Sequence, residues 1–395
     1  MAATARRASR LIGCGSWGNS VTLLTITGQE ASILNGPTRR SLSRAFGIAA
    51  LAASLAMPSP AGAQQPQPAA PAGSTPQPAG STIDAIRARG ALICGVNTGL
   101  AGFAQPDSQG VWRGFDVDYC RAIAIAIFGT DQNRVRYVPT TAQARFTALQ
   151  SGEVDVLSRN TTWTLSRDTS LGFDFPAINF FDGQGFLVKR SLGVQNARAL
   201  DGATICVQPG TTTEQNLADW SRGARVQIRP VVIERLEENI AAYNAGRCDA
   251  YTTDISGLAA IRSNQQVPAD HVILPDVISK EPLGPVVRHG DQRFADIVRW
   301  VHFGLINAEE FGVTQANVAQ MLANDPRPEV QRMLGRSGGL GQMLGLDNAW
   351  MVNIIRTVGN YGEIFQRQLA PIGLQRGPNA LWTQPGGQQY APPFR

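Results

Sequence analysis

The feature that most constrains the fold is an alternation of short apolar strand patterns with helix patterns, which begins at Ala91. A first group predicts strands at 91–97, 134–138 and 154–158 and helices at 115–128 and 142–151. A second group predicts strands at 185–190, 203–208, 230–234 and 249–253 and helices at 213–220 and 237–245. This alternation is typical of βαβ units, so we expect parallel sheets that are covered by helices.

The two groups also share a local pattern. Residues 146–155 and 239–249 each contain a helix that ends at a glycine, Gly152 or Gly246, shortly before a strand that begins beside an aspartate. Glycine ends helices because it adopts positive φ at little cost. We therefore predict an α/β protein with two similar Rossmann-like lobes, a hinge and a ligand cleft between them. The predicted boundaries are 82–182 plus 283–330 for lobe 1, 183–282 for lobe 2 and 331–395 for a C-terminal helical extension.

The N-terminal region has the pattern of an export signal. Paired arginines at 39–40 precede an apolar run at 45–57, and the small residues of 61–63 allow cleavage near Ala63. The apolar run is shorter than the roughly 20 residues that span a bilayer. Residues 1–63 are thus predicted to be a leader with a signal peptide, and 64–81 a Pro/Ala/Gln-rich linker. An amphipathic targeting peptide or an anchor is the alternative, and the export route stays open.

The net charge of +5 does not predict a polyanionic partner. The leader holds six arginines and one acidic residue, and the rest of the chain has equal numbers of basic and acidic residues. We therefore expect no nucleic-acid partner.

Four cysteines lie beyond the leader, namely Cys94, Cys120, Cys206 and Cys248. An even number in an oxidising compartment suggests disulfides, and pairing within each group, 94 with 120 and 206 with 248, is the natural choice. Free buried thiols are the alternative. The chain has no CxxC motif or His/Cys cluster, so we expect no metal site and no cofactor.

Polar residues follow three predicted strands at the end where open α/β sheets bind ligands. They are the run from Arg159 to Arg167, the run from Gly210 to Glu214, and Asp254. Taken singly, the Gly-Thr-Thr turn and Asp254 are each explained as helix caps. Together, an arginine and helix N–H groups suit a carboxylate, while an acid and hydroxyls suit an ammonium. The combination complements a zwitterionic α-amino acid.

From Thr82 to about Asn317 the chain resembles the periplasmic amino-acid-binding proteins of polar amino acid ABC transporters, solute-binding protein family 3. It is most similar to the general L-amino-acid-binding branch, and that similarity continues to Arg395. The motifs that carry it are residues 97–100, 160–167, 210–214, 251–254 and 359–363. The resemblance implies the type II periplasmic binding protein fold, export to the periplasm, and delivery of free L-amino acids to membrane permease subunits by a monomer.

The resemblance also implies roles for individual residues. Arg167 would pair with the ligand α-carboxylate, helped by Thr212 and the backbone N–H groups of Thr162 and Thr212. Asp254 would hold the α-ammonium with the Thr162 hydroxyl and the Asn160 carbonyl. Thr211, in the same turn as Thr212, is included among the ligand-binding residues.

Three further positions concern specificity. Leu100 stands where members that bind cationic amino acids have an aromatic residue. Arg145 falls where members selective for aspartate and glutamate place an arginine, and Glu237 falls where those members have a more neutral or basic residue. Charges of both signs near one side-chain pocket would favour a broad range that includes glutamate and aspartate. The alternative is that Arg145 and Glu237 form a surface ion pair.

An enzyme on the same two-lobe scaffold, such as a periplasmic dehydratase, is the main alternative function. It would need a carboxylate poised for acid–base chemistry, for which Glu237 or Glu214 could serve. Neither has a recognisable partner in the sequence, so no catalytic residue is assigned.

Overall fold

The computed structural model describes residues 81–395, and the predicted leader and most of the linker lie outside these residues. The first lobe is built on a three-stranded parallel sheet of order β4–β1–β5. Helix α2 fills the predicted range, and the other elements differ from prediction by a few residues at their ends. The bounds are α1 (Thr82–Arg89), β1 (Leu92–Val96), α2 (Phe115–Phe128), β4 (Val135–Pro139), α3 (Arg145–Ser151) and β5 (Val156–Leu157).

The second lobe contains a five-stranded sheet of order β10–β9–β11–β8–β12. Its strands and helices are β8 (Gln184–Lys189), β9 (Thr204–Val207), α4 (Thr212–Ala224), β10 (Arg229–Val232), α5 (Leu236–Asn244), β11 (Ala250–Asp254), α6 (Ile255–Ser263) and β12 (His271–Ile273). The expectation of purely parallel sheets is wrong here, because β8 runs antiparallel to both β11 and β12. Strand β8 brings the chain into the lobe and so starts at the edge where β11 ends, with Gln184 opposite Asp254.

Both faces of the second sheet are covered, as expected for a sheet inside an α/β layer. Successive side chains of a strand point to opposite faces. Accordingly Leu187 packs in the largest hydrophobic cluster of the molecule, whereas Phe186 and Val188 pack in a separate cluster with Leu217 of α4.

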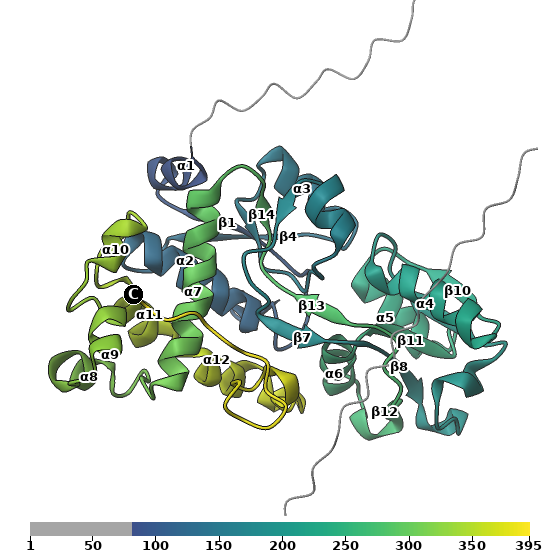
Figure 1. Cartoon of the computed structure of the whole chain (residues 1–395). Helices are drawn as coiled ribbons and strands as arrows, with labels where there is room; N and C mark the ends of the chain where they lie inside the picture. The colour runs from purple at the N-terminus through teal and green to yellow at the C-terminus, as the bar shows by residue number, and fades with distance from the viewer. Residues whose placement is uncertain (1–80) are drawn as a thin grey trace, which may run out of the picture. The chain divides into compact units, whose positions relative to one another are not determined.

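Two short antiparallel strands connect the lobes, β7 (Phe180–Asp182) and β13 (Glu281–Leu283). They lie side by side between the first sheet and helix α6 (Figure 1). Their register places Asp182 opposite Glu281, so two acidic residues meet at the entrance to the second lobe. The remaining short strands are β2 (Gln105–Pro106), β3 (Trp112–Arg113), β6 (Phe173–Asp174) and β14 (Val287–Arg288).

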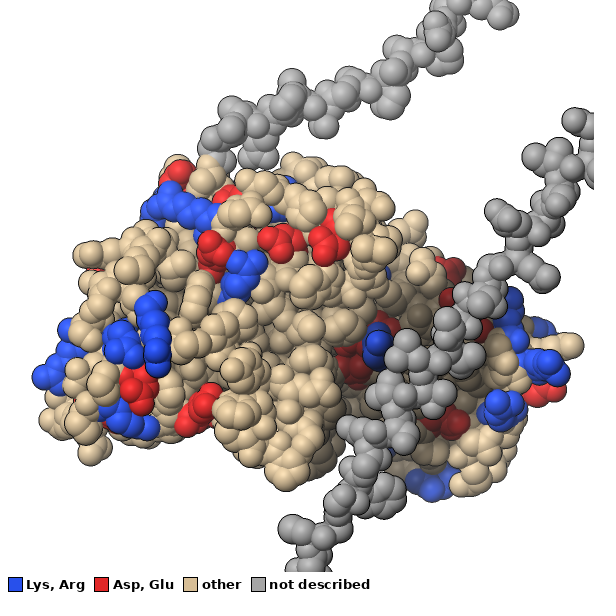
Figure 2. All heavy atoms as spheres, in the orientation of Figure 1, with Lys and Arg blue, Asp and Glu red and all other residues tan. Residues whose placement is uncertain are grey.

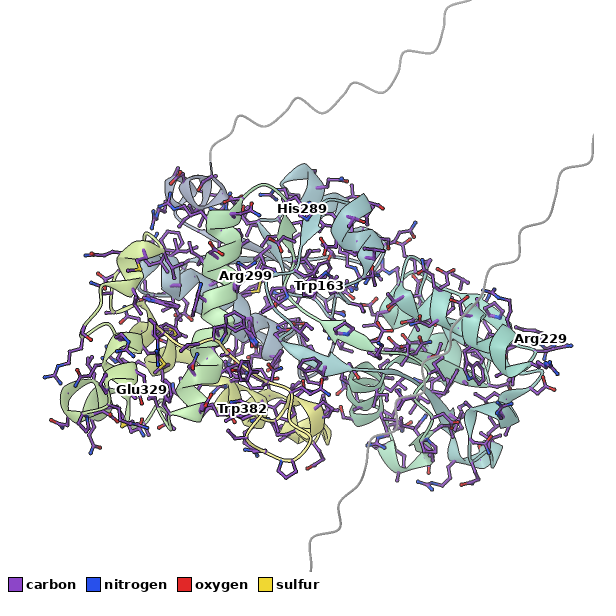
Figure 3. The ribbon with its side chains drawn as sticks, viewed as in Figure 1. Trp163, Arg229, His289, Arg299, Glu329 and Trp382 are labelled. Atoms are coloured by element: carbon purple, nitrogen blue, oxygen red, sulfur yellow. A yellow bond between two sulfur atoms is a disulfide. The ribbon has the colours of Figure 1, made fainter. Side chains whose placement is uncertain are left out.

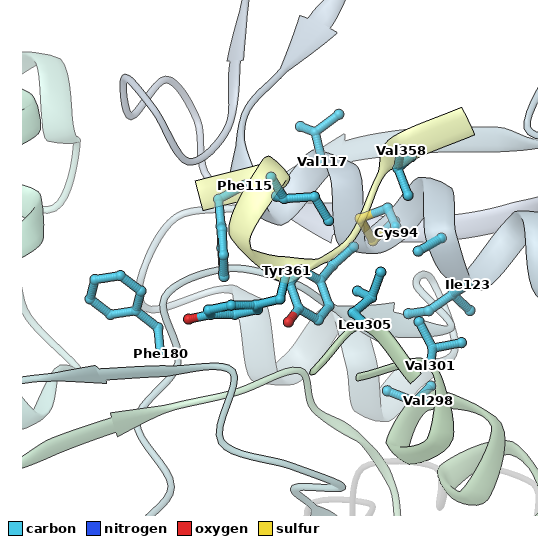
Figure 4. Packing of buried hydrophobic residues seen from close by; sticks show 14 of the residues in the cluster. Cys94, Phe115, Val117, Ile123, Phe180, Val298, Val301, Leu305, Val358 and Tyr361 are labelled. Atoms are coloured by element: carbon cyan, nitrogen blue, oxygen red, sulfur yellow. A yellow bond between two sulfur atoms is a disulfide. The ribbon is translucent and has the colours of Figure 1, made fainter. Parts of the chain in front are cut away.

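The C-terminal part of the chain packs against the first lobe. Its helices are α7 (Gln292–Glu310), α8 (Val318–Asn324), α9 (Pro328–Met333), α10 (Leu340–Met343), α11 (Trp350–Val358) and α12 (Tyr361–Gln368). Helix α11 contacts α2 and α7, and Tyr361 at the start of α12 donates a 3.0 Å hydrogen bond to the Asn179 carbonyl. Figure 4 shows Tyr361 beside Phe115, in one cluster with Val301 and Leu305. The segment therefore completes the core of the first lobe.

Each lobe carries one disulfide, and the predicted pairing is confirmed. Cys94 of β1 is bonded to Cys120 of α2, and Cys206 of β9 is bonded to Cys248, which precedes β11. No helix among residues 81–395 is both long and apolar enough to cross a membrane. Acidic and basic side chains are interspersed on the face of the molecule that Figure 2 shows.

Candidate ligand-binding site

A cavity of about 50 Å³ lies between the two lobes, and its wall comes from both of them. Loops after β5 in the first lobe and after β9 and β11 in the second contribute polar residues, so the cavity lies beyond the carboxyl ends of these strands, as predicted. The wall consists of Asn97, Leu100, Ala142, Arg145, Arg159, Asn160, Thr162, Gln208, Thr211, Thr212, Thr213, Leu236, Tyr251, Thr253, Asp254, Gly257 and Ile261.

The first lobe places three buried arginines at this site. Arg145 opens helix α3, while Arg159 and Arg167 belong to the segment after β5, and their exposed fractions are 3%, 4% and 6%. Arg159 donates from Nε to the Thr140 carbonyl at 3.0 Å, and Arg167 donates from Nη1 to the Thr162 carbonyl at 2.8 Å. The Arg145 Nε has no hydrogen-bond partner among the described residues. The guanidinium carbons of Arg145 and Arg167 lie 4.8 and 5.0 Å from the centre of the Phe146 ring, a cation–π geometry.

Burial makes these positive charges costly. It lowers the pKa of Arg145 well below its usual value, and the charges of Arg159 and Arg167 lower that pKa further. Burial also lowers the pKa of Arg159 and of Arg167 to about 10 each. Neighbouring acids act in the opposite direction on all three pKa values, including Asp254 in each case. The site is therefore rich in desolvated positive charge, which favours anionic groups.

The second lobe supplies the opposite charge. Asp254 ends β11 and occupies the N-cap position of α6, yet its side chain makes no cap hydrogen bond. The carboxylate of Asp182 accepts from the Ser256 N–H instead, at 3.3 and 3.4 Å. Burial raises the pKa of Asp254, and the nearby acids Asp182 and Glu281 raise it further, while Arg145 and Arg167 lower it. The capping explanation of Asp254 is thus wrong for the side chain, which remains available to the cavity.

The threonines of the Gly-Thr-Thr turn have divided roles. Thr211 is the N-cap of α4, where its hydroxyl accepts from the Glu214 N–H at 3.0 Å and donates to the Gln208 carbonyl at 2.8 Å. Its hydroxyl is therefore occupied by the cap, although the residue lines the cavity. Thr212 reaches the other lobe, and its hydroxyl oxygen lies 3.3 Å from that of Thr162. The lobes are in contact at this point, as in a closed clamshell.

The structure brings six of the eight predicted residues to the cavity wall, namely Arg145, Asn160, Thr162, Thr211, Thr212 and Asp254. Asn160 has φ of +40° and a buried Oδ1 without a partner among the described residues. Arg167 lies beside the wall, close enough for its charge to act on Asp254. Glu237 is exposed on α5, where the preceding Leu236 faces the cavity.

The position of Glu237 supports neither a role in the side-chain pocket nor a surface ion pair with Arg145. The residue lies outside the cavity wall, and residues 81–395 contain no ion pair between it and Arg145. Arg145 is buried, so the alternative of a surface pair does not describe it.

Sequence reasoning missed two charged residues of the site. Arg159 begins the polar run after β5, but a lone arginine after a strand gives no signal that it will be buried. Glu281 belongs to β13, and its carboxylate contacts both lobes. Glu281 reaches the site only because β13 passes between the two lobes in the folded chain, which no local sequence pattern indicates. Figure 3 marks Trp163, whose backbone N–H donates to the Pro282 carbonyl and so joins the loop after β5 to β13.

The chain is similar to known proteins over most of its length. Residues 92–310 match the bacterial extracellular solute-binding proteins, family 3. The chain belongs to this family. This family 3 protein is 57% identical over 320 residues to the general L-amino acid-binding periplasmic protein AapJ of Rhizobium johnstonii, covering 80% of this chain and 93% of that one. It is 56% identical to the glutamate/glutamine/aspartate/asparagine-binding protein BztA of Rhodobacter capsulatus, covering 80% and 94% of the respective chains.

A solved structure supports the fold of the family 3 protein. This structure is an ABC transporter periplasmic binding protein from Brucella ovis with glutathione bound, with 55% sequence identity and a TM-score of 0.78. The match covers 80% of this chain and 100% of the other. The predicted family and the predicted type II periplasmic binding protein fold are thereby confirmed.

Proposed function

We propose that this protein is the periplasmic binding component of an ABC importer for L-amino acids, with a range that includes glutamate and aspartate. The observation that carries the proposal is the division of buried charge at the cavity. The first lobe places Arg145 and Arg159 in its wall and Arg167 beside it, and the second lobe places Asp254 in its wall. An α-amino acid carries one charge of each sign, so it satisfies both lobes at once. The names of the two curated relatives, which bind amino acids, point to the same ligands.

In the proposed complex the Arg167 guanidinium pairs with the α-carboxylate, together with the backbone N–H groups of Thr162 and Thr212. Asp254 binds the α-ammonium, with the Thr162 hydroxyl and the Asn160 carbonyl. Arg145 is directed at the side chain of the ligand, where its guanidinium would donate to a carboxylate or amide oxygen.

The proposed ligand-binding residues come from both lobes, which are joined by a hinge. We assign lobe 1 to residues 82–182 and 283–330, lobe 2 to 183–282, and the hinge to β7 and β13. Because the two charged ends of the ligand bind different lobes, ligand binding favours the closed state. The closed form of this monomer would then dock on the membrane permease and release the amino acid.

Binding is favoured over catalysis by the positions of the acids that an enzyme would use. Glu237 is exposed, and the Glu214 carboxylate accepts from the Gly210 N–H at 3.0 Å in the turn before α4. Neither residue is part of the cavity wall. The relatives are described as binding proteins, which agrees with the absence of an assigned catalytic group.

The size of the cavity gives an expectation about ligands. The cavity is small, so we expect larger ligands to bind with the lobes further apart. Glutathione, which the Brucella ovis protein binds, would need a less closed arrangement of the lobes.

Calorimetric titration tests the proposal. The purified protein is unfolded without reductant, dialysed and refolded to remove bound ligand, and then titrated with acidic, neutral and basic L-amino acids and with glutathione. Saturable heats with several amino acids are expected. Absence of binding to every amino acid would overturn the proposal, whereas binding of glutamate and aspartate alone would narrow it to an acidic-amino-acid receptor selected by Arg145.

A further inference from the structure

The carboxylate of Glu281 is the most highly connected acid of the site. Glu281 is 1% exposed and lies on the connecting strand β13. Its Oε2 accepts from the Thr162 hydroxyl at 2.5 Å and from the Thr212 hydroxyl at 3.0 Å. Its Oε1 accepts from the Asn216 amide at 2.7 Å and from the Ser279 hydroxyl at 2.6 Å. The four donors belong to the first lobe, the second lobe and the strand connection.

These contacts decide which way two hydroxyl groups can act in the cavity. A hydroxyl has one hydrogen to donate and two lone pairs to accept with. Bonds to a carboxylate are stronger than bonds between neutral hydroxyls, so Thr162 and Thr212 direct their hydrogens at Glu281 rather than at each other across 3.3 Å. Each hydroxyl oxygen then offers only lone pairs to the cavity that both residues line.

Lone pairs suit an ammonium and repel a carboxylate. With Asp254 and the Asn160 carbonyl, the two hydroxyl oxygens make four acceptor groups in one cavity, enough to receive the three N–H donors of an α-ammonium. The family resemblance assigned the Thr212 hydroxyl to the α-carboxylate. In the observed hydrogen-bond arrangement that hydroxyl has no hydrogen left to give.

We propose that Glu281 is a positioning residue that turns the Thr162 and Thr212 hydroxyls into acceptors and so makes the site select amino acids over the corresponding hydroxy acids. The inference rests on the proposed function and adds to it the reason for ammonium selectivity. Selectivity for amino acids would also depend on closure of the two lobes, because Glu281 contacts Thr162 and Thr212 together only when the lobes meet.

The test compares L-leucine with (S)-2-hydroxy-4-methylpentanoate, in which a hydroxyl replaces the ammonium, by calorimetry on the refolded protein and on Glu281→Gln. The Asn216 amide donates to Oε1, so the glutamine oxygen should stay at that position and the glutamine NH2 should face Thr162 and Thr212. The two threonine hydroxyls then accept from the NH2 and turn their own hydrogens into the cavity. Leucine affinity should fall roughly tenfold or more, while hydroxy-acid affinity should fall much less or rise. The matched control is Glu309→Gln, which removes an acid paired with Arg376 in the C-terminal segment and should leave both affinities unchanged.

Equal losses for leucine and the hydroxy acid in Glu281→Gln would overturn the positioning role and leave a structural one. If that variant does not fold, Thr212→Val in place of it decides the question. A larger loss for leucine than for the hydroxy acid supports the acceptor role of Thr212, and equal losses contradict it. Failure of leucine and all other amino acids to bind the unsubstituted protein would instead refute the proposed function.

Discussion

The two lobes are built from the same βαβ units but contribute opposite charges to the cavity between them. The first lobe contributes three buried arginines, whereas the second contributes Asp254 and the Thr212 hydroxyl at the start of α4. Either lobe alone presents uncompensated charge at its inner face. A ligand with one positive and one negative group relieves both, so the difference between the lobes explains why a zwitterion would hold them together.

The lobes also differ in how deeply they bury the same side-chain pair. In the first lobe the Tyr119 hydroxyl lies 2.8 Å from His302 Nδ1, and in the second the Tyr243 hydroxyl lies 2.8 Å from His271 Nδ1. His302 is 2% exposed because the C-terminal helices cover that side of the first lobe, while His271 is only partly buried. The added C-terminal segment therefore buries the Tyr–His pair of the first lobe more deeply.

The largest effect is expected from removing the charge that only the second lobe provides. Asp254→Asn keeps the shape of the side chain but leaves a bound ammonium without its anion. A buried charge that loses its partner costs about 2–5 kcal/mol, which is about 30-fold or more in affinity for every amino acid. Calorimetry measures the loss, and Arg167→Ala should produce a comparable one from the other lobe. Undiminished leucine binding in either variant would remove that residue from the site.

The next effect concerns the two Tyr–His pairs. Burial lowers the pKa of His302 to about 3, whereas an unfolded histidine titrates near 6.5. Below that pH the unfolded chain binds a proton that the folded chain does not, so stability should fall by about 1.4 kcal/mol per pH unit between about pH 6.5 and pH 3. Urea unfolding at several pH values should therefore show a shallower acid slope for His302→Gln than for the unsubstituted protein.

His271→Gln is the matched control for that measurement. Burial also lowers the pKa of His271, but this residue is less buried, so its replacement should change the acid slope less. If the two variants had the same slope, the difference in burial between the lobes would have no energetic consequence.

Much of this arrangement could be predicted from the sequence, for identifiable reasons. Helix α2, the disulfide of each lobe and the polar strand ends follow from local patterns, because periodicity and strand ends are properties of short segments. The antiparallel direction of β8 and the role of Glu281 depend on how the chain crosses between the lobes. The cap of α6 illustrates the same limit, since Asp182 replaces Asp254 from a distant strand.

A smaller and more selective effect is expected at Arg145. Its guanidinium is buried and its Nε lacks a hydrogen-bond partner among the described residues, so removing the side chain breaks no hydrogen bond of that atom. Arg145→Ala should weaken glutamate by about tenfold or more, since a charge-assisted hydrogen bond is lost, and should leave leucine much less affected. Titration of both ligands into one preparation measures the ratio. Equal losses for glutamate and leucine would place Arg145 outside the side-chain pocket.

The smallest effect is expected at Glu237, the position where sequence and structure diverge most. The carboxylate is exposed on the first turn of α5, and Leu236 rather than Glu237 faces the cavity. Exposed charges contribute little, so Glu237→Gln should change the affinities for glutamate, leucine and arginine within about threefold. Calorimetry of this variant beside Arg145→Ala separates a local effect from a long-range one. A rise in glutamate affinity beyond that limit, with arginine affinity falling, would show that the Glu237 charge reaches the ligand. The second lobe would then contribute negative charge to the cavity from Glu237 as well as from Asp254.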